Sequence, residues 1–165
     1  TLVEGYPMTT HIAPTANVSS NAKVSGYTDV WNNATISGYA RIYGNASVSG
    51  KAKVRGNAIV SDTACVCSKA QIGGYAKVYG YAMVGGKAKV FDNAYVSDNA
   101  RVMGIATISD SAWIRGNTKI YGDAKVCGNA HVYGDAMVFG KTILEGDVTI
   151  PSGYIRNIHW WSDIP

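Results

Sequence analysis

The 165-residue sequence is short of bulky core residues, with only two Phe and few Leu, and it has only four Pro and three Cys. No stretch of about 18 apolar residues occurs, so no membrane-spanning helix is expected. No charged segment is followed by an apolar stretch, so no secretory signal is expected either. Hydrophobic residues still make up 47% of the chain, mostly as Ala, Val and Ile, alongside 19 Gly. These small residues predict one domain of thin, closely stacked layers.

The cysteines Cys65, Cys67 and Cys127 are odd in number and lack the spacing of a disulfide framework. They favour a reducing compartment, and we expect the protein in the cytoplasm. Cys65 and Cys67 could present two thiolates on one strand face. Because no further Cys or nearby His completes a ligand set, the sequence predicts small surface side chains here and no metal site.

The dominant feature is a six-residue repeat. Ala stands two positions before each aliphatic residue in nearly every copy, and Thr28, Thr118 and Thr142 are among the few replacements. The 24 aliphatic positions follow one another without interruption: Ile12, Val18, Val24, Val30, Ile36, Ile42, Val48, Val54, Val60, Val66, Ile72, Val78, Val84, Val90, Val96, Val102, Ile108, Ile114, Ile120, Val126, Val132, Val138, Leu144 and Ile150.

The repeat predicts short strands joined by tight corners. Ala and the aliphatic residue lie two positions apart and therefore share one face of a strand, while the residue between them points the other way. Pairs such as Gly44-Asn45, Gly122-Asp123 and Asp92-Asn93 are of the types that tolerate corner conformations. Gly in every turn and many β-branched residues exclude a helix. Such short strands bury their apolar face only when coils stack.

The frame resembles the hexapeptide-repeat, left-handed parallel β-helix superfamily, whose unit has an aliphatic residue followed four positions later by a small one, as in residues 48–53. The resemblance covers residues 12–150. It implies an all-β fold: a left-handed β-solenoid, a triangular prism of about eight 18-residue coils. Superfamily members include bacterial and phage acyltransferase-like proteins, and they commonly form homotrimers.

Three segments follow from this frame: an N-terminal cap or extension at 1–11, the β-helix at 12–150 and a C-terminal tail at 151–165. Solenoid ends expose strand edges and need covering. The tail is rich in apolar residues, and we expect it to cover the last coil as a plug or strap. Docking onto a partner or neighbouring subunit is the alternative. Its apolar residues are Tyr154, Ile155, Ile158, Trp160, Trp161 and Ile164.

An 18-residue coil sorts the outward residues into three faces. The first face is poorest in charge and richest in Met and aromatic side chains, which is typical of an interface. We expect self-association through it, with a trimer favoured, and a different protein partner is the alternative. The expected interface residues are Met83, Met103, Tyr121, Met137 and Phe139.

Charge is unevenly distributed in this chain of net charge +4. Ten of its 15 Lys and Arg residues lie on strand faces: Lys23, Arg41, Lys53, Arg55, Lys77, Lys89, Arg101, Arg115, Lys119 and Lys125. Most acids within the repeats lie at corners instead: Asp62, Asp92, Asp98, Asp110, Asp123, Asp135 and Asp147. Basic faces could attract an anionic small molecule. The alternative is that Lys protects flat β surfaces from aggregation. The pattern does not favour nucleic acid.

The third face carries the candidate ligand-binding residues Trp113, Arg115, His131 and Tyr133. An 18-residue coil places His131 between Trp113 and Thr149, with Arg115 and Tyr133 alongside. The cluster could bind a planar or sugar-like ligand through stacking and cation contacts. The alternative is an ordinary exposed His.

Two functions remain open. The resemblance implies acyl transfer from CoA-type donors with a His as general base, and His131 near an intersubunit cleft is the candidate, with acetyl-CoA as cofactor. Many such enzymes carry the base on a loop that interrupts the repeats, and no interruption occurs between Ile12 and Ile150. The sequence therefore favours a non-catalytic scaffold or binding module without a cofactor.

Overall fold

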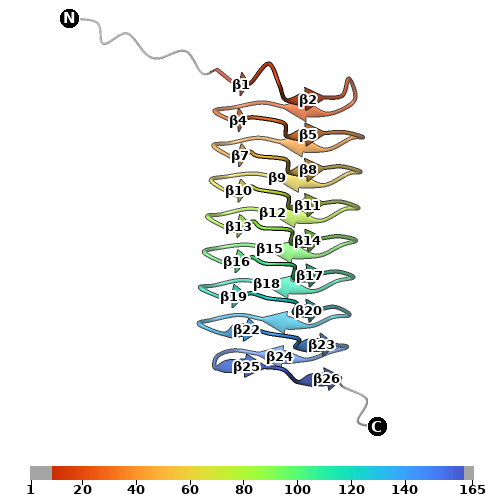
Figure 1. The fold of residues 1–165 in the computed structure, drawn as a ribbon, viewed down its shortest axis with the longest axis vertical. Coiled ribbons are helices and arrows are strands. Elements are labelled where there is room, and N and C mark those ends of the chain that lie inside the picture. Colours follow the sequence, from red (N-terminus) through yellow and green to blue (C-terminus); the bar gives the residue numbers. More distant parts are fainter. Residues whose placement is uncertain (1–8, 162–165) are drawn as a thin grey trace, which may run out of the picture.

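Strands of two or three residues alternate with tight corners along the whole of residues 9–161, which the computed structural model describes (Figure 1). These residues contain no helix. Every strand pairs in parallel with the equivalent strand one coil above and below, so the chain winds into a three-sided solenoid of about eight turns. The predicted parallel β-solenoid is confirmed.

The three sheets each take every third strand. Sheet A consists of β1 (His11–Ile12), β4 (Asp29–Val30), β7 (Ser47–Val48), β10 (Cys65–Val66), β13 (Met83–Val84), β16 (Arg101–Val102), β19 (Lys119–Ile120), β22 (Met137–Phe139) and β25 (Tyr154–Arg156). Sheet B consists of β2 (Asn17–Val18), β5 (Thr35–Ile36), β8 (Lys53–Val54), β11 (Gln71–Ile72), β14 (Lys89–Val90), β17 (Thr107–Ile108), β20 (Lys125–Val126), β23 (Ile143–Glu145) and β26 (His159–Trp161). Sheet C consists of β3 (Lys23–Val24), β6 (Arg41–Ile42), β9 (Ile59–Val60), β12 (Lys77–Val78), β15 (Tyr95–Val96), β18 (Trp113–Ile114), β21 (His131–Val132) and β24 (Thr149–Ile150).

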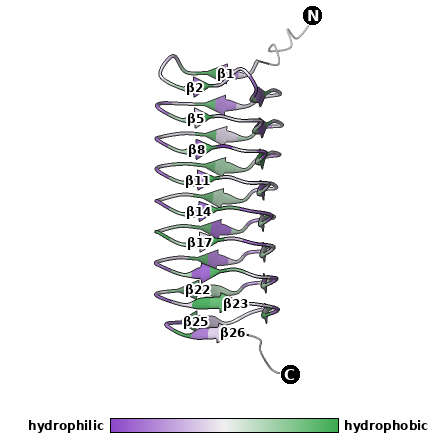
Figure 2. Cartoon of the chain, turned by 90° about the vertical axis from the view of Figure 1, so that its right-hand side faces the viewer, coloured by the Kyte–Doolittle hydropathy of each residue, from purple (hydrophilic) through white to green (hydrophobic). Residues whose placement is uncertain are grey.

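The bore of the solenoid is filled by the repeated Ala and aliphatic side chains. Every one of them from Val30 to Val138 has an exposed fraction of 0%. The alternation of apolar and polar residues within each coil is visible in Figure 2. Thr118 fits the bore because its hydroxyl donates a 2.6 Å hydrogen bond to the carbonyl of Arg115, and Thr142 does the same to Phe139 at 2.7 Å. Polar replacements of Ala are thus tolerated where a corner carbonyl lies in reach.

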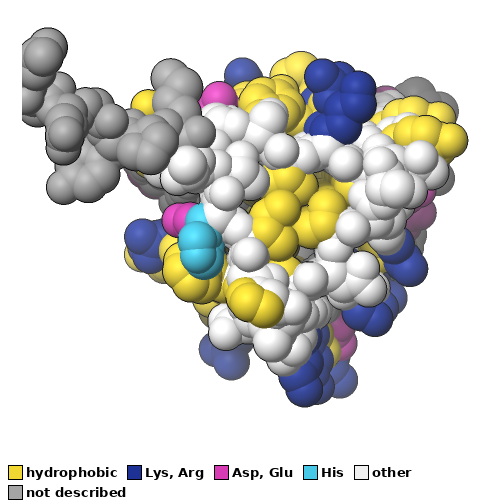
Figure 3. All heavy atoms as spheres, turned by 90° about the horizontal axis from the view of Figure 1, so that it is seen from above, with side chains coloured by type: hydrophobic (Ala, Val, Ile, Leu, Met, Phe, Trp, Pro, Cys, Tyr) yellow, Lys and Arg dark blue, Asp and Glu magenta, His cyan; other side chains and the backbone are white. Residues whose placement is uncertain are grey.

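The bore is open at its N-terminal end within the described residues. Ile12 is 44% exposed, and Val18 and Val24 are only partly buried. In the view along the axis, apolar side chains fill the centre of a triangular outline (Figure 3). Most of the predicted N-terminal cap, residues 1–8, lies outside the described residues, and His11 from its end is already part of β1.

The tail extends sheets A and B by one shortened, partial coil. Tyr154 pairs with Met137 after 17 residues and His159 with Ile143 after 16, whereas complete coils repeat after 18, as in Cys65 and Met83. Residues 151–161 therefore cover the edges of β22 and β23 by strand addition, not as a strap laid across the last coil. Ile155 packs against the core. The predicted apolar residue Ile164 lies outside the described residues.

The corners explain where the acids lie. The first corner residue adopts a positive φ, and Gly is favoured because a Cβ there approaches the next coil closely. At Gly86 (φ +67) an added Cβ would lie 2.7 Å from the carbonyl oxygen of Gly104. Where Asp takes this position, its carboxylate accepts a hydrogen bond from the backbone of the next coil. Gly116 N–H donates to Asp98 at 2.9 Å, and Gly128 N–H to Asp110 at 2.9 Å.

We expect Asp98→Ala to lower the free energy of unfolding by about 1–2 kcal/mol, because Ala keeps the positive φ without the compensating hydrogen bond. Asp98→Gly should cost less, since Gly adopts this φ without strain. Asp123→Ala, at a second corner position where no side-chain hydrogen bond is made, should stay within about 0.5 kcal/mol of the wild type. Urea denaturation measures all three, and equal losses for Asp98→Ala and Asp123→Ala would contradict the capping role.

Candidate functional site

The outward side chains of sheet C form a ladder along the solenoid axis. Tyr95, Trp113 and His131 occupy equivalent positions on β15, β18 and β21 and pair in register. The rings of Trp113 and His131 are stacked, with centroids 5.5 Å apart and planes 10° apart. Tyr95 and Trp113 lie 5.0 Å apart at 42°. We call these three residues the ring ladder. It ends on Lys77, whose Nζ lies 5.1 Å from the centroid of Tyr95.

A second column runs beside the ring ladder. Arg115 follows β18 and Tyr133 follows β21, and the guanidinium carbon of Arg115 lies 5.2 Å from the centroid of the Tyr133 ring. The structure therefore brings all four sequence-predicted ligand residues, Trp113, Arg115, His131 and Tyr133, onto one surface. Their side chains already contact one another in pairs, which holds each in a defined orientation.

The orientation of the rings decides how they can meet a ligand. Trp113 has one face toward Tyr95 and the other toward His131, so it presents its edge outward, and it is 39% exposed. The second face of the imidazole points along the column toward Thr149, which has a short, exposed side chain. Stacking on a ligand is therefore available at the His131 end of the ladder, and edge contacts are available along its length.

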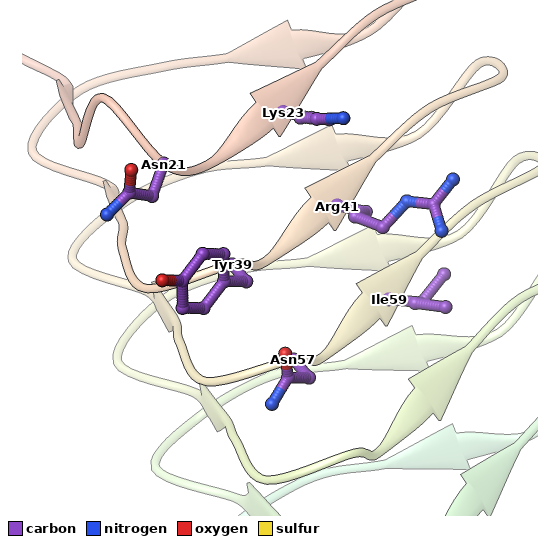
Figure 4. A pocket seen from close by; sticks show the side chains of 6 residues that line it. All are labelled: Asn21, Lys23, Tyr39, Arg41, Asn57 and Ile59. Carbon is purple, nitrogen blue, oxygen red and sulfur yellow. The ribbon is translucent and has the colours of Figure 1, made fainter.

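Sheet C also carries a hollow near the N-terminal end that the sequence did not reveal. Its volume is about 380 Å³. In Figure 4, Lys23, Arg41 and Ile59 extend from successive strands, and the remaining lining residues come from the adjacent corners. Lys23 and Arg41 also line a second hollow of about 260 Å³ beside Tyr43. The corner residues of the first hollow are Asn21, Tyr39 and Asn57.

The electrostatics of sheet C are uniform. Lys23, Arg41 and Lys77 lie in the same column as the ring ladder, and Arg115 lies in the neighbouring one. None of the outward positions of sheet C within the described chain is acidic. A ligand lying along this face meets cations at one end and rings at the other. The sequence placed these cations correctly, but only the structure shows the hollow between Arg41 and the corner.

The expected interface residues all lie on sheet A. Met83 and Met137 belong to one column, and Met103, Tyr121 and Phe139 to the next; all five are partly buried. Cations interrupt the surface, because Arg101 and Lys119 separate Met83 from Met137 in their column, and Arg156 lies 5.6 Å from the Phe139 ring. The apolar part is a band rather than a complete face.

The three histidines lie on three different sheets. His11 on sheet A lies 4.1 Å from the Trp31 ring, and His159 on sheet B contacts Glu145 at 3.6 Å. His131 on sheet C stacks on Trp113, and in residues 9–161 no carboxylate hydrogen-bonds to it. The described chain contains no group of three or more His, Cys, Asp or Glu that could hold a metal ion.

The thiols show where the surface is least hydrated. Burial raises the pKa of Cys127, the nearby carboxylates of Glu145 and Asp110 raise it further, and Lys125 opposes them. Burial also raises the pKa of Cys65, with further increases from the charge of Cys67 and a hydrogen bond to it. Both thiols are therefore largely protonated at neutral pH.

The family described as YdcK Beta solenoid repeat matches residues 40–56. That segment contains one repeat unit of sheet A and neighbouring corners, and the rest of the solenoid keeps the same frame. The match and the parallel three-sheet architecture fit a hexapeptide-repeat-like β-helix superfamily, as the sequence predicted. The comparison with curated proteins found no significant match. No helix in residues 9–161 is long and apolar enough to cross a membrane.

We expect Cys127 to react slowly with Ellman's reagent in a Cys65→Ser, Cys67→Ser background, because a raised pKa leaves little thiolate. Glu145→Gln removes a negative charge, lowers the pKa and should speed the reaction at mildly alkaline pH. Lys125→Gln removes the opposing positive charge and should slow it. The pH profile of the rate gives the pKa of each variant, and identical profiles would contradict the electrostatic assignment.

Proposed function

We propose that the protein is a non-catalytic binding module that presents sheet C to an elongated, anionic ligand with planar or sugar-like rings. The observation that supports this most strongly is the in-register ring ladder, continuous with a column of cations and free of acidic neighbours. In this proposal the module acts in the cytoplasm.

The ligand would lie parallel to the solenoid axis. Its anionic groups would contact Lys23, Arg41 and Lys77, and a ring would stack on the open face of His131. The Trp113 indole N–H is a donor at the outward edge of the ladder. Because the backbone is fixed by the solenoid and the rings by mutual stacking, little conformational freedom is lost on binding.

A catalytic role for His131 would require a partner that orients it and an acceptor within hydrogen-bond distance. The stacked position of His131 supports a binding role better, because the ring is held by Trp113 and not by a carboxylate. The acyltransferase-like alternative with acetyl-CoA is therefore tested as one arm of the binding experiment.

We further propose that sheet A mediates self-association into a trimer. The support is its band of partly buried Met and aromatic side chains, which would gain further burial in an interface. The cations Arg101 and Lys119 must then remain at the rim or face acidic corners of the neighbour, because like charges opposed in an interface are costly.

Isothermal titration with a sulfated heparin tetrasaccharide tests the sheet C proposal, with neutral cellotetraose and acetyl-CoA as comparison probes. We expect the sulfated sugar to bind, and Trp113→Ala and Arg115→Ala each to weaken binding about tenfold or more, a loss of about 1.4 kcal/mol.

Trp31→Ala is the matched control, because Trp31 also stacks on a His but lies on sheet A. It should leave binding unchanged. Equal losses from Trp31→Ala and Trp113→Ala would contradict a site on sheet C. Binding and turnover of acetyl-CoA, abolished by His131→Ala, would favour the enzymatic alternative instead.

Self-association is tested by native mass spectrometry of the wild type beside Met103→Asp and Tyr121→Asp. We expect a trimer that dissociates to monomers in both variants, because a buried unpaired carboxylate is costly. Tyr43→Asp, an exposed aromatic on sheet C, should leave the assembly unchanged. A monomeric wild type would contradict the proposal.

A further inference from the structure

Four sulfur-containing side chains gather on sheet A at coils that adjoin one another. Cys65 and Cys67 lie two residues apart and point outward from the same strand region. Met83 is paired directly opposite Cys65 on the next coil, β13. Met103 lies one coil further on, in the column that contains Cys67 and Gly85.

Gly85 creates the space in which two of these sulfur atoms meet. It is buried, and a Cβ added to it would lie 3.0 Å from Cys67 Sγ and 2.9 Å from Met103 Sδ. Those two distances place the sulfur atoms no more than 5.9 Å apart, across two coils. The absent side chain of Gly85 thus lets Met103 fold back toward Cys67.

The second thiol lies against the first. Cys65 and Cys67 interact through a hydrogen bond and through charge, and both are only partly exposed. Together with Met83 opposite Cys65, the cluster contains two thiols and two thioethers. We call Cys65, Cys67, Met83 and Met103 the sulfur cluster.

This donor set selects one class of metal ion. Thiolate and thioether sulfur are soft ligands that prefer Cu(I), whereas Mg²⁺, Ca²⁺ and Mn²⁺ require oxygen ligands. Structural zinc sites normally have four Cys, His or carboxylate ligands, and only two are present here. We propose that the sulfur cluster is a binding site for a soft monovalent cation, Cu(I), with Cys65, Cys67 and Met103 as ligands and Met83 beside them.

The geometry needs only a small adjustment. Two sulfur atoms that each lie about 2.3 Å from a metal are at most about 4.6 Å apart, somewhat closer than the upper limit for Cys67 and Met103. The three rotatable bonds of the Met side chain can provide this movement without moving the backbone.

Charge and protons balance in this site. Each coordinating thiol loses its proton to solvent, so one Cu(I) and two thiols give a complex of net charge −1 and two protons. Arg101, which follows Met83 in its column, and Lys69, at the corner after Cys67, supply positive charge on the same side of the solenoid. They favour the anionic complex.

The experiment is an anaerobic competition in which the reduced protein withdraws Cu(I) from its coloured complex with bathocuproine disulfonate. We expect one Cu(I) per chain. Cys67→Ser should weaken binding at least about 100-fold, and Met103→Leu and Gly85→Ala about tenfold or more, since even residues outside the ligand set commonly change metal affinity by about 10–100-fold.

The chain provides a matched control for each variant. Cys127→Ser removes a thiol on sheet B, and Met137→Leu removes a thioether elsewhere on sheet A. Gly73→Ala adds a Cβ at the other buried glycine, where it would contact the Phe91 ring instead of sulfur. All three controls should bind Cu(I) as the wild type does, and circular dichroism verifies that each variant is folded.

A second readout locates the metal. Bound Cu(I) should protect Cys65 and Cys67, but not Cys127, from alkylation, as measured by peptide mass spectrometry. The proposal is overturned if the wild type withdraws no Cu(I), or if Cys127→Ser weakens binding as much as Cys67→Ser. It is equally overturned if Met103→Leu and Gly85→Ala both bind as the wild type does, because the site would then be a simple dithiol. Met103→Leu preserves side-chain volume, so it separates lost ligation from lost folding.

Discussion

In-register stacking of identical coils is the constraint on which the whole structure depends. A strand of two residues buries too little to persist alone, so each coil is stable only between two others with the same length and the same small interior side chains. Full burial of a Val or Ile contributes roughly 1.5–3 kcal/mol, and that gain requires a neighbouring coil at the right register. Where the tail shortens the coil, from 18 residues to 17 and 16, only two sheets continue, and the ladder of sheet C ends at β24.

The same constraint turns the surface into columns. Because register is fixed, the outward neighbour of any residue on a complete coil is the residue 18 positions away, about 4.8 Å along the axis. Side chains of matching chemistry therefore stack without any local turn or loop to position them. The Trp113–His131 stack on sheet C, the Arg55 guanidinium 5.5 Å from the Phe91 ring on sheet B, and the Met103–Gly85–Cys67 group on sheet A all arise in this way.

Periodicity predicted the interior and the assignment of residues to faces, because both depend only on the backbone repeat. It placed His131 beside Trp113 and Arg115 beside Tyr133 before any coordinates were known. It could not give side-chain torsions, so the edge-outward rings and the hollow beside Arg41 emerged only in three dimensions. The carboxylate of Asp98 was assigned to a corner, but its hydrogen bond to Gly116 depends on a positive φ that the residue type alone does not fix.

Function in such a molecule resides where a column departs from its neighbours. The interior is nearly invariant along the axis and cannot distinguish one coil from another, whereas single exceptions on the surface can. Gly85 is one such exception: it leaves a gap in a column of larger side chains, and sulfur atoms from the coils on either side converge over it. Gly73 is another, and there the gap is filled by Phe91 instead. The same backbone vacancy thus produces a sulfur cluster on one sheet and a packed aromatic ring on the next, according to which residues lie one coil away.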